Sequence, residues 1–383
     1  MDAFYASVAL RDRPELRDVP VIVGGGHRGV VLSANYPARE RGVRSGMSGT
    51  EARRLCPEAV RLSPDFGDFE TVSRSVMETF RSITPLVEAY SLDEAFLDVS
   101  GAVRRLGTPL QIAELVRARI HDEQRITCSV GLARTVSVAK LASRRAKPDG
   151  VLVVPADRIE EMVHPLDVGE LFGVGPKTRA KLRKIGLVTV GDVARMPAET
   201  LRHVVGAAAG HQLHQLAWGT DRRTLTPRRA DDDPERSMGS EETFGRDVAD
   251  PAVIHRELLR LASRVTARMR RAGMAGRTVA IRVRYADFTT ITRSHTLPDP
   301  TDTTAEVHAT AVRLFDALTD PRRIRLVGVR VEGLRPRAGA HRQGLLGERE
   351  HGWPEADRAI DQVGMRFGRG AVRPATLFAG DRP

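Results

Sequence analysis

A charged segment near the middle of the chain, "RRADDDPERS" at residues 228–237, limits the folds that are possible. It contains a proline and no large apolar side chain, so it is typical of a linker. We place this linker at 223–235. The 383-residue chain therefore divides into separate parts, and its length allows two to four domains that each bury a core.

The residues before the linker change character at about residue 154. Up to that point, short apolar runs alternate with helical patterns, as in "ITCSVGLARTVSVAKLAS" (126–143), which is typical of a strand, a glycine turn and a helix. Such alternation indicates an α/β layer. From 155 to 222 the pattern is helical with short loops. We expect one unit at 1–65, a second at 66–154 and a helical unit at 155–222.

The residues after the linker predict a small α+β unit at 236–337. Apolar residues recur at helical spacing along one stripe, with arginines opposite: Ile254, Leu258, Leu261, Val265 and Met269. "TVAIRVRYADF" (278–288) alternates as a strand does, which puts Arg282 and Arg284 on the outward face. "RRIRLVGVRVEGL" (322–334) is a similar strand. The fold class that we expect for the whole chain is multidomain α+β.

The charge balance favours a polyanionic partner. The chain has 60 Lys and Arg against 49 Asp and Glu, a net charge of +11, which suggests nucleic acid first and anionic lipid second. All five lysines lie between Lys140 and Lys184. No run of 18 apolar residues and no charged-then-apolar leader appears, so we expect a cytoplasmic protein without a membrane contact. Two cysteines are too few for a disulfide framework or a thiolate metal site.

Two neighbouring acids, Asp93 and Glu94, lie in "VEAYSLDEAFLDVS" (87–100), where two apolar strands flank "SLDE". This pattern predicts a hairpin with the acids at its tip. Within a strand the two side chains would point to opposite faces, but at a tip both carboxylates can turn the same way. Two hard oxygen donors fit Mg²⁺, which leaves its other positions to water and phosphate. The alternative is an acidic turn that is merely solvated.

A second motif, "FGVGPKTRAKLRKIG" (172–186), predicts a helix-hairpin-helix. We expect a helix ending near Leu171, a turn over Gly173 and Gly175, and a second helix starting at Pro176. The glycines allow backbone N–H groups to approach a phosphate, and a helix N-terminus favours the anion. Such a contact grips the DNA backbone without reading its sequence. The alternative is an ordinary helical turn.

Two further segments supply candidate phosphate ligands. "SANYPARERGVRSGM" (33–47) contains Tyr36 and Arg39, and "RRAKPDG" (144–150) contains Lys147. The arginine offers a planar fork for phosphate oxygens and the lysine a point charge. Each residue by itself is typical of an ordinary surface.

Together these motifs resemble the Y-family of DNA polymerases, specifically the DinB or DNA polymerase IV group. The likeness covers residues 1–190 and extends weakly to about 337 through "RSMGSEETF" (236–244). It is carried, in family order, by "MDAFYASV", "SANYPARERGVRSGM", "YSLDEAFLDVS", "SVGLARTVSVAKLAS", "AKPDG" and "LFGVGPKTRAKLRKIG". The resemblance implies a right-hand architecture with fingers, a palm, a helix-hairpin-helix thumb and a little finger, in a nucleoid-associated monomer.

The resemblance also implies a chemistry and its residues. Asp93 would hold two Mg²⁺ ions, and Glu94 would complete the site nearest the primer 3′-OH, in a low-fidelity translesion polymerase without proofreading. Tyr5 would be the steric gate against a 2′-OH. The incoming dNTP would contact Phe4, Ser33, Tyr36, Arg39 and Lys147. Primer-template DNA would contact Gly173, Gly175, Lys177, Thr178, Lys181, Arg282 and Arg284.

One family feature lies outside the sequence. In the family an apolar strand runs into Asp-Met-Asp, whose first aspartate is the third metal ligand, and this sequence starts at the Met. We expect Asp2 to cap the helix that follows it, accepting a backbone N–H near residue 4 or 5. Activity of the chain as written is therefore expected to be weak.

Alternative functions remain open. Some Y-family relatives have lost their carboxylates and act as adaptors, although the Asp93–Glu94 pair and Tyr5 speak against that function here. A repair lyase or glycosylase would need a catalytic residue just after the hairpin motif, where only Asp192 is available. In the tail at 338–383, "RQGLLGE" (342–348) resembles a clamp-binding peptide through Gln343 and Leu346. Ile360, Val363 and Phe367 predict packing along a short terminal helix.

Overall fold

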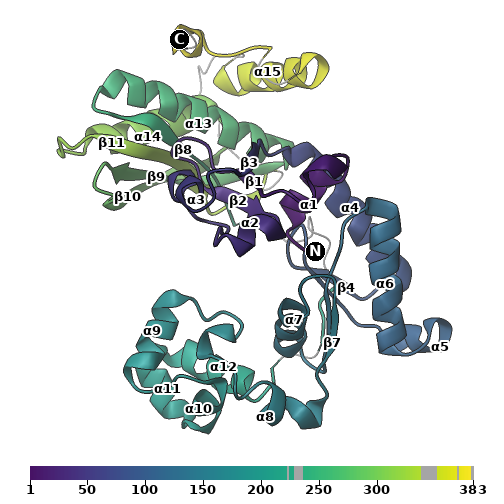
Figure 1. Cartoon of the computed structure of the whole chain (residues 1–383). Helices are drawn as coiled ribbons and strands as arrows, with labels where there is room; N and C mark the ends of the chain where they lie inside the picture. The colour runs from purple at the N-terminus through teal and green to yellow at the C-terminus, as the bar shows by residue number, and fades with distance from the viewer. Residues whose placement is uncertain (222–223, 228–235, 338–351, 369–370, 381–383) are drawn as a thin grey trace. The chain divides into compact units, whose positions relative to one another are not determined.

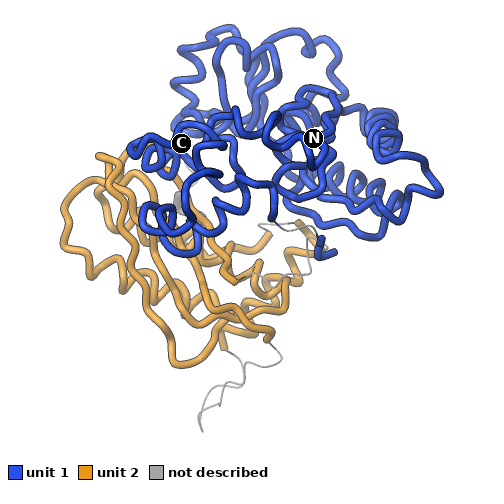
Figure 2. Tube along the Cα trace, turned by 90° about the horizontal axis from the view of Figure 1, so that it is seen from below, with its two compact units in different colours: residues 1–232 blue, residues 233–383 orange. Residues whose placement is uncertain are grey.

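The computed structural model describes residues 1–383 except 222–223, 228–235, 338–351, 369–370 and 381–383. The chain forms two compact units, Met1–Asp232 and Asp233–Pro383 (Figure 2). The division falls at the predicted linker. Among the described residues no helix is long and apolar enough to cross a membrane.

The first part of unit 1 is a three-stranded sheet of order β2-β1-β3, in which β1 is antiparallel to β2 and parallel to β3. Its buried side chains, including Ile22, Val31 and Val43, form a small core under two short helices. Asn35 caps the first of these helices by accepting the N–H of Ala38. The elements are β1 (Val21–Gly24), β2 (Val31–Ala34), α2 (Tyr36–Glu40), α3 (Gly49–Leu55) and β3 (Val60–Leu62).

A larger core in unit 1 surrounds helix α4, whose residues Phe69, Val76 and Phe80 are buried. The short strands here pair in twos, β4 with β5 antiparallel and β6 with β7 parallel, instead of forming one continuous layer. The predicted strand–turn–helix at 126–143 is confirmed as β6 and α7. The elements are α1 (Phe4–Leu10), α4 (Phe66–Ile83), β4 (Val87–Ala89), β5 (Ala95–Leu97), α5 (Val103–Leu106), α6 (Pro109–Gln124), β6 (Val130–Leu132), α7 (Val136–Arg145) and β7 (Val151–Val153).

The last part of unit 1 is helical, as its sequence predicts (Figure 1). Its core contains Leu182, Val193 and Leu201, and it is continuous with Val138 and Leu141 of α7. The buried apolar side chains therefore hold this helical part against α7. The elements are α8 (Ile159–Met162), a 3₁₀ turn (Val168–Glu170), α9 (Pro176–Lys184), α10 (Val190–Arg195), α11 (Ala198–Val205) and α12 (Ala207–Ala217).

Unit 2 is an antiparallel sheet of order β10-β9-β11-β8 with two helices packed on it (Figure 1). The predicted stripe from Ile254 to Met269 is buried, and so are the inward residues Val279, Ile281 and Val283. The elements are β8 (Ser237–Val248), α13 (Pro251–Arg271), β9 (Met274–Tyr285), β10 (Thr290–Thr301), α14 (Thr304–Asp316), β11 (Ile324–Glu332), β12 (Arg335–Pro336), α15 (Trp353–Phe367) and a 3₁₀ turn (Ala375–Gly380).

The terminal helix α15 differs from its prediction. Ile360 and Val363 are half-buried, but Phe367 is 67% exposed. The helix is held instead by Arg270 of α13, whose guanidinium lies 3.2 Å from a carboxylate oxygen of Asp357 and 2.6 Å from one of Asp361. Polar contacts therefore anchor α15.

Candidate active site

The acidic pair lies at the tip of a hairpin, as the sequence predicts. Strands β4 and β5 pair with Val87 opposite Leu97 and Ala89 opposite Ala95. The carbonyl of Glu94 accepts the N–H groups of Tyr90 (2.8 Å) and Ser91 (3.1 Å), which closes the tip. Asp93 is half-buried and Glu94 is exposed.

Both acids line one large cavity of about 1190 Å³ in unit 1. The same cavity is lined by Met1, by Lys140 and Lys147, and by residues 172–175 of the glycine hairpin. Two carboxylates, two lysines and the glycine hairpin therefore share one space.

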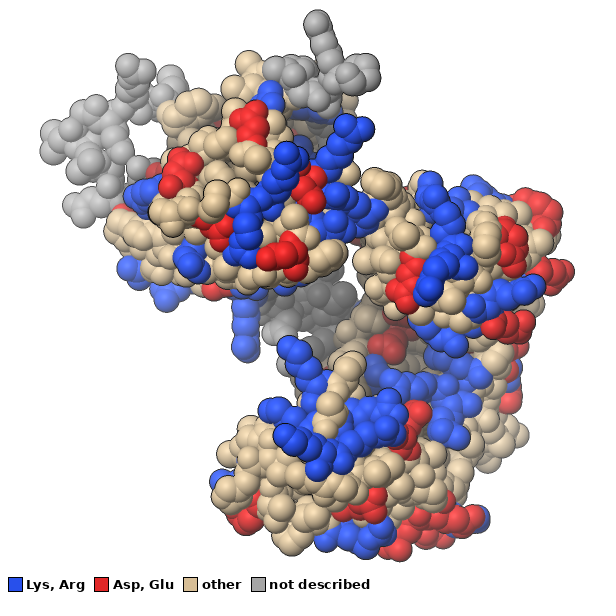
Figure 3. Space-filling model, turned by 60° about the vertical axis from the view of Figure 1, so that its left-hand side comes forward, with Lys and Arg blue, Asp and Glu red and all other residues tan. Residues whose placement is uncertain are grey.

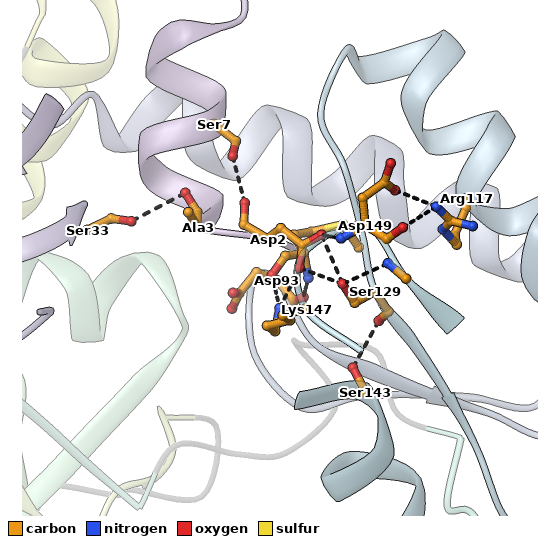
Figure 4. Close-up of polar contacts among 12 residues, drawn as sticks. Asp2, Ala3, Ser7, Ser33, Asp93, Arg117, Ser129, Ser143, Lys147 and Asp149 are labelled. Carbon is orange, nitrogen blue, oxygen red and sulfur yellow. Dashed lines mark hydrogen bonds and ion pairs between the residues drawn. The ribbon is translucent and has the colours of Figure 1, made fainter. Parts of the chain in front are cut away.

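The start of the chain runs directly past Asp93 (Figure 4). The Met1 amino nitrogen donates to the Asp93 carbonyl oxygen at 2.7 Å, and the Asp2 N–H donates to the Thr127 carbonyl at 3.0 Å. Burial and the nearby Lys147 ammonium lower the pKa of the Met1 amino group. A residue joined to the Met1 nitrogen would therefore lie beside Asp93.

The prediction that Asp2 caps the first helix is wrong. Helix α1 is preceded by Ala3 in a left-handed conformation (φ 42°) and receives no side-chain cap. The Asp2 carboxylate, which is fully buried, instead accepts the Ser129 hydroxyl (2.9 Å), the Lys147 ammonium (2.9 Å) and the Asp149 N–H (2.9 Å) (Figure 4). Three partners far along the chain outcompete the local N–H groups for this carboxylate.

These partners set the ionisation of Asp2. Burial by itself would raise the pKa of this carboxyl group, but the Lys147 charge and the hydrogen bonds from Lys147, Asp149 and Ser129 outweigh burial and hold the pKa below its ordinary value. Lys147 also donates to the Met1 carbonyl at 2.7 Å. The ammonium group is thereby fixed at the edge of the cavity.

The proposed sugar-contacting residues sit on α1 close to the acidic pair. The Tyr5 ring packs on Phe4 and Phe69, with ring centroids 5.3 and 4.9 Å away. Burial and then the negative charge of Asp93 raise the pKa of Tyr5. Ser33 is buried and donates to the Ala3 carbonyl at 3.3 Å.

Tyr36 and Arg39 form a second polar group. The Arg39 guanidinium lies 5.1 Å from the Tyr36 ring centre and donates to the Ala34 carbonyl at 2.8 Å. Burial and the Asp2 charge raise the pKa of Tyr36 to about 12. The Tyr36 hydroxyl is buried and has no hydrogen-bond partner among the described residues. An orphaned donor of this kind suits an anionic ligand, because an unmet hydrogen bond is costly.

The donor chemistry of the hairpin tip fits a divalent cation. Two adjacent carboxylates are the ligands that Mg²⁺ uses when its other positions go to water and phosphate. Within the part of the chain that the structure describes, no group of three or more His, Cys, Asp and Glu side chains could hold a metal ion. The candidate set is thus Asp93 and Glu94.

The glycine hairpin lies between two helical segments, as the sequence predicts. Gly173 is left-handed (φ 82°), Gly175 precedes α9, and Pro176 begins that helix. Before the hairpin, a short 3₁₀ helix (Val168–Glu170) is capped by Leu171, where the sequence predicts that the first helix ends. Asp167, one residue earlier, binds Arg179 and Arg183 of α9 and keeps its pKa at about 2, chiefly through the Gly169 N–H.

The lysines of α9 contrast with its arginines. Lys177, Lys181 and Lys184 are exposed and have no ion-pair partner among the described residues, whereas the two arginines bind Asp167. Thr178 is half-buried. Figure 3 shows Lys and Arg side chains gathered on one side of the lobe that holds α9 to α12.

The remaining predicted residues lie in unit 2 or outside the description. Arg282 is exposed and binds Glu241 (3.1 Å), while Arg284 donates to the Thr290 hydroxyl (2.9 Å). Gln343 and Leu346 lie outside the described residues.

Three residues near the site were not predicted from the sequence. The Lys140 ammonium lies 2.8 Å from Glu94, and Ser129 and Asp149 bind the Asp2 carboxylate. The only sequence feature that pointed to Lys140 was the confinement of all five lysines to residues 140–184.

The sequence of the chain matches known families and proteins. The impB/mucB/samB family model matches residues 1–144, its C-terminal domain model 235–346, and the thumb-domain model of DNA polymerase-iota 169–221. A DNA polymerase IV of Desulfatibacillum aliphaticivorans is 43% identical over 98% of this chain and 95% of its own length. Another, from Alkalilimnicola ehrlichii, is 43% identical over 87% of this chain and 93% of its own.

Solved structures agree on the fold. A Y-family DNA polymerase chimera of Dbh and Dpo4 has a TM-score of 0.77 at 22% identity, over 86% of this chain and 96% of that one. An insertion ternary complex of Dbh DNA polymerase has a TM-score of 0.57 at 22% identity, over 87% of this chain and 96% of that one. The fold and the relatives define a DNA-directed DNA polymerase. The chain belongs to the impB/mucB/samB family, the Y-family of DNA polymerases, and within it to the DNA polymerase IV group.

Proposed function

We propose that this chain copies DNA templates, including damaged ones, by adding dNTPs to a primer 3′-OH with low fidelity and without proofreading. The observation that supports the proposal is the shared cavity, whose lining includes Asp93, Glu94, Lys147 and the glycine hairpin. Residues 66–154 would act as the palm, 1–65 as the remaining palm and the fingers, 155–222 as the thumb, and 236–337 as the little finger.

The residues of the site would bind the metal ions, the triphosphate and the sugar. Asp93 and Glu94 would bind two Mg²⁺ ions, which when bound stabilise the attacking and leaving oxygens of the phosphoryl transfer. Tyr36, Arg39, Lys147 and Ser33 would hold the triphosphate. Tyr5 beside Phe4 would contact the sugar, since its ring is fixed by Phe69 and its hydroxyl lies within the field of Asp93.

DNA would be gripped mainly through phosphates. The exposed Lys177 and Lys181, with Thr178 and the backbone N–H groups near Gly173 and Gly175, offer contacts that do not depend on base sequence. Arg282 and Arg284 would add contacts from unit 2. In the tail, Gln343 and Leu346 would bind a sliding clamp, and deletion of 343–347 should then abolish stimulation by the clamp.

The presence of two carboxylates at the hairpin tip also supports a second candidate function. Because the described residues supply two acids at the hairpin tip and Asp2 is already satisfied by three partners, an adaptor that binds DNA without extending primers is the alternative. Mg²⁺-dependent dNTP binding would favour the polymerase, since an adaptor needs no nucleotide.

The test is primer extension on undamaged and abasic templates by the wild-type chain, Asp93→Asn and Glu94→Gln. We expect each variant to lose about a hundredfold or more in rate, because interactions with metal-stabilised charge contribute several kcal/mol. Asp122→Asn is the control, since that carboxylate lies on α6, is 78% exposed and does not line the cavity. Extension by both variants at the wild-type rate would contradict the proposal.

A further inference from the structure

Lys140 contacts Glu94 of the acidic pair, yet the functions assigned above do not use it. It projects from α7, and its ammonium nitrogen lies 2.8 Å from Oε2 of Glu94. The Lys140 side chain is 27% exposed and that of Glu94 is 45% exposed. An ion pair this open contributes little to stability, so its stability value alone does not explain the arrangement.

Two aromatic rings hold the same ammonium group. Its nitrogen lies 4.1 Å from the centre of the Tyr90 ring and 5.3 Å from that of Phe172, and the two ring centres are 5.9 Å apart. Both distances are within the range of a cation–π attraction. Lys140 is therefore bound on two sides by rings and on a third by a carboxylate.

One ring belongs to the hairpin that carries the acidic pair, and the other adjoins the glycine hairpin. Tyr90 follows β4 in the hairpin that carries Asp93 and Glu94, and Phe172 directly precedes Gly173 in the glycine hairpin. One side chain thus connects the candidate metal ligand with the candidate DNA-binding loop.

We propose that Lys140 is a positioning residue that competes with a divalent cation for the Glu94 carboxylate, and that Phe172 links this competition to the glycine hairpin. The proposal rests on the proposed function, because it takes Glu94 as a metal ligand. Lys140 orients Glu94 and neutralises it before a cation binds. A bound cation and the ammonium then share one carboxylate, and like charges at such close range weaken each other's binding.

The direct test is Mn²⁺ binding to the full chain without DNA, measured by electron paramagnetic resonance. We expect Lys140→Met, which keeps the length and the contact with the rings but removes the charge, to bind Mn²⁺ about tenfold more tightly. Lys140→Arg keeps the charge and should stay within about twofold of wild type. Unchanged affinity in Lys140→Met, or an equal change in both variants, would overturn the proposal.

A double-mutant cycle identifies Glu94 as the intermediary. In a Glu94→Gln background, Lys140→Met should have no further effect on Mn²⁺ affinity, and an undiminished effect there would contradict the competition. Phe172→Leu should tighten Mn²⁺ binding in the same direction by a smaller factor; an unchanged affinity would exclude the link to the hairpin. Lys140→Gln replaces Lys140→Met if circular dichroism shows that the latter does not fold.

The same Mn²⁺ measurements distinguish a failure of the proposed metal site from a failure of the proposed role of Lys140. If Asp93→Asn and Glu94→Gln bind Mn²⁺ as wild type does, the metal site itself is wrong, whatever Lys140 does. If these variants lose Mn²⁺ while Lys140→Met is unchanged, the metal site stands and only the role of Lys140 is excluded.

Discussion

The Lys147 ammonium lies 2.9 Å from a carboxylate oxygen of Asp2, joining the beginning of the chain to a loop 145 residues away. Ser129 and the Asp149 N–H complete the shell around this buried carboxylate. The pair positions Lys147 beside Asp93 at the edge of the cavity. It also makes the stability of unit 1 depend on pH.

Replacement of Asp2 by Asn should lower the free energy of unfolding by about 2–3 kcal/mol at pH 7, because it leaves Lys147 without its counter-charge. The pKa of Asp2 in the folded protein is below its ordinary value of 3.8, so its contribution is present above that value and is lost as the pH falls through the folded pKa. The difference in the free energy of unfolding between wild type and Asp2→Asn, measured in urea, should therefore shrink below about pH 4. The exposed Asp122→Asn is the control. A gap that is equal at pH 7 and pH 3 would contradict this role.

Tyr36→Phe separates ligand binding from stability. The hydroxyl has no partner among the described residues, so its removal should leave the melting temperature unchanged or slightly raised. If it donates to the triphosphate, KM for dNTP should rise about tenfold, as expected for a lost hydrogen bond to a charged group. Because its pKa is about 12, the phenol remains a donor up to pH 10. A normal KM in Tyr36→Phe would exclude the contact.

The two α9 lysines should govern the salt dependence of DNA binding. Lys177→Ala combined with Lys181→Ala should weaken binding to all sequences alike and reduce the slope of log affinity against log salt by about 2. Fluorescence anisotropy between about 50 and 200 mM salt measures this slope. Arg202→Ala removes an exposed arginine that already pairs with Glu199 (2.7 Å) and should leave the slope unchanged. An equal change in both proteins would indicate only a general charge effect.

Arg270→Ala should release the C-terminal helix. The Arg270 side chain is 7% exposed, and its removal leaves the buried Asp357 without a counter-charge, a loss of about 3 kcal/mol or more. Hydrogen exchange over residues 353–367 should accelerate while β9 and β11 stay protected. Arg358→Ala, an exposed position on α15, should have no such effect. Unchanged exchange in Arg270→Ala would show that apolar contacts hold the helix.

An N-terminal extension tests the need for a third carboxylate. An apolar strand ending in Asp, joined to Met1, would bring a carboxylate beside Asp93, since the Met1 nitrogen lies 2.7 Å from the Asp93 carbonyl. We expect primer extension to rise at least tenfold over the 383-residue form, because bridging cations bind better with a third anionic ligand. The same extension ending in Asn is the control. Equal rates for the Asp form and the 383-residue form would contradict the expectation.

The sequence predicts features that depend on neighbours along the chain. The β4–β5 hairpin with Asp93 and Glu94 at its tip, the strand alternation of β9 and the buried stripe of α13 follow from periodicity. Strand β10 is harder to predict, because it is an edge strand with polar residues and two prolines, which edges tolerate.

The site depends on contacts that local patterns do not contain. A capping rule assigns Asp2 to its own helix, but partners 127 to 147 residues away hold it. The pairing of Lys140 with Glu94 spans 46 residues in the same way. The types of residue in the site could be predicted from the sequence, but their hydrogen-bond partners required the folded chain.

The most direct test is anomalous diffraction from crystals of the full chain with primer-template DNA, a dNTP and Mn²⁺. We expect Mn²⁺ peaks within coordination distance of the carboxylates of Asp93 and Glu94, and a triphosphate in contact with Lys147, Tyr36 and Arg39. A nucleotide bound elsewhere, or Mn²⁺ absent from this hairpin tip, would contradict the account.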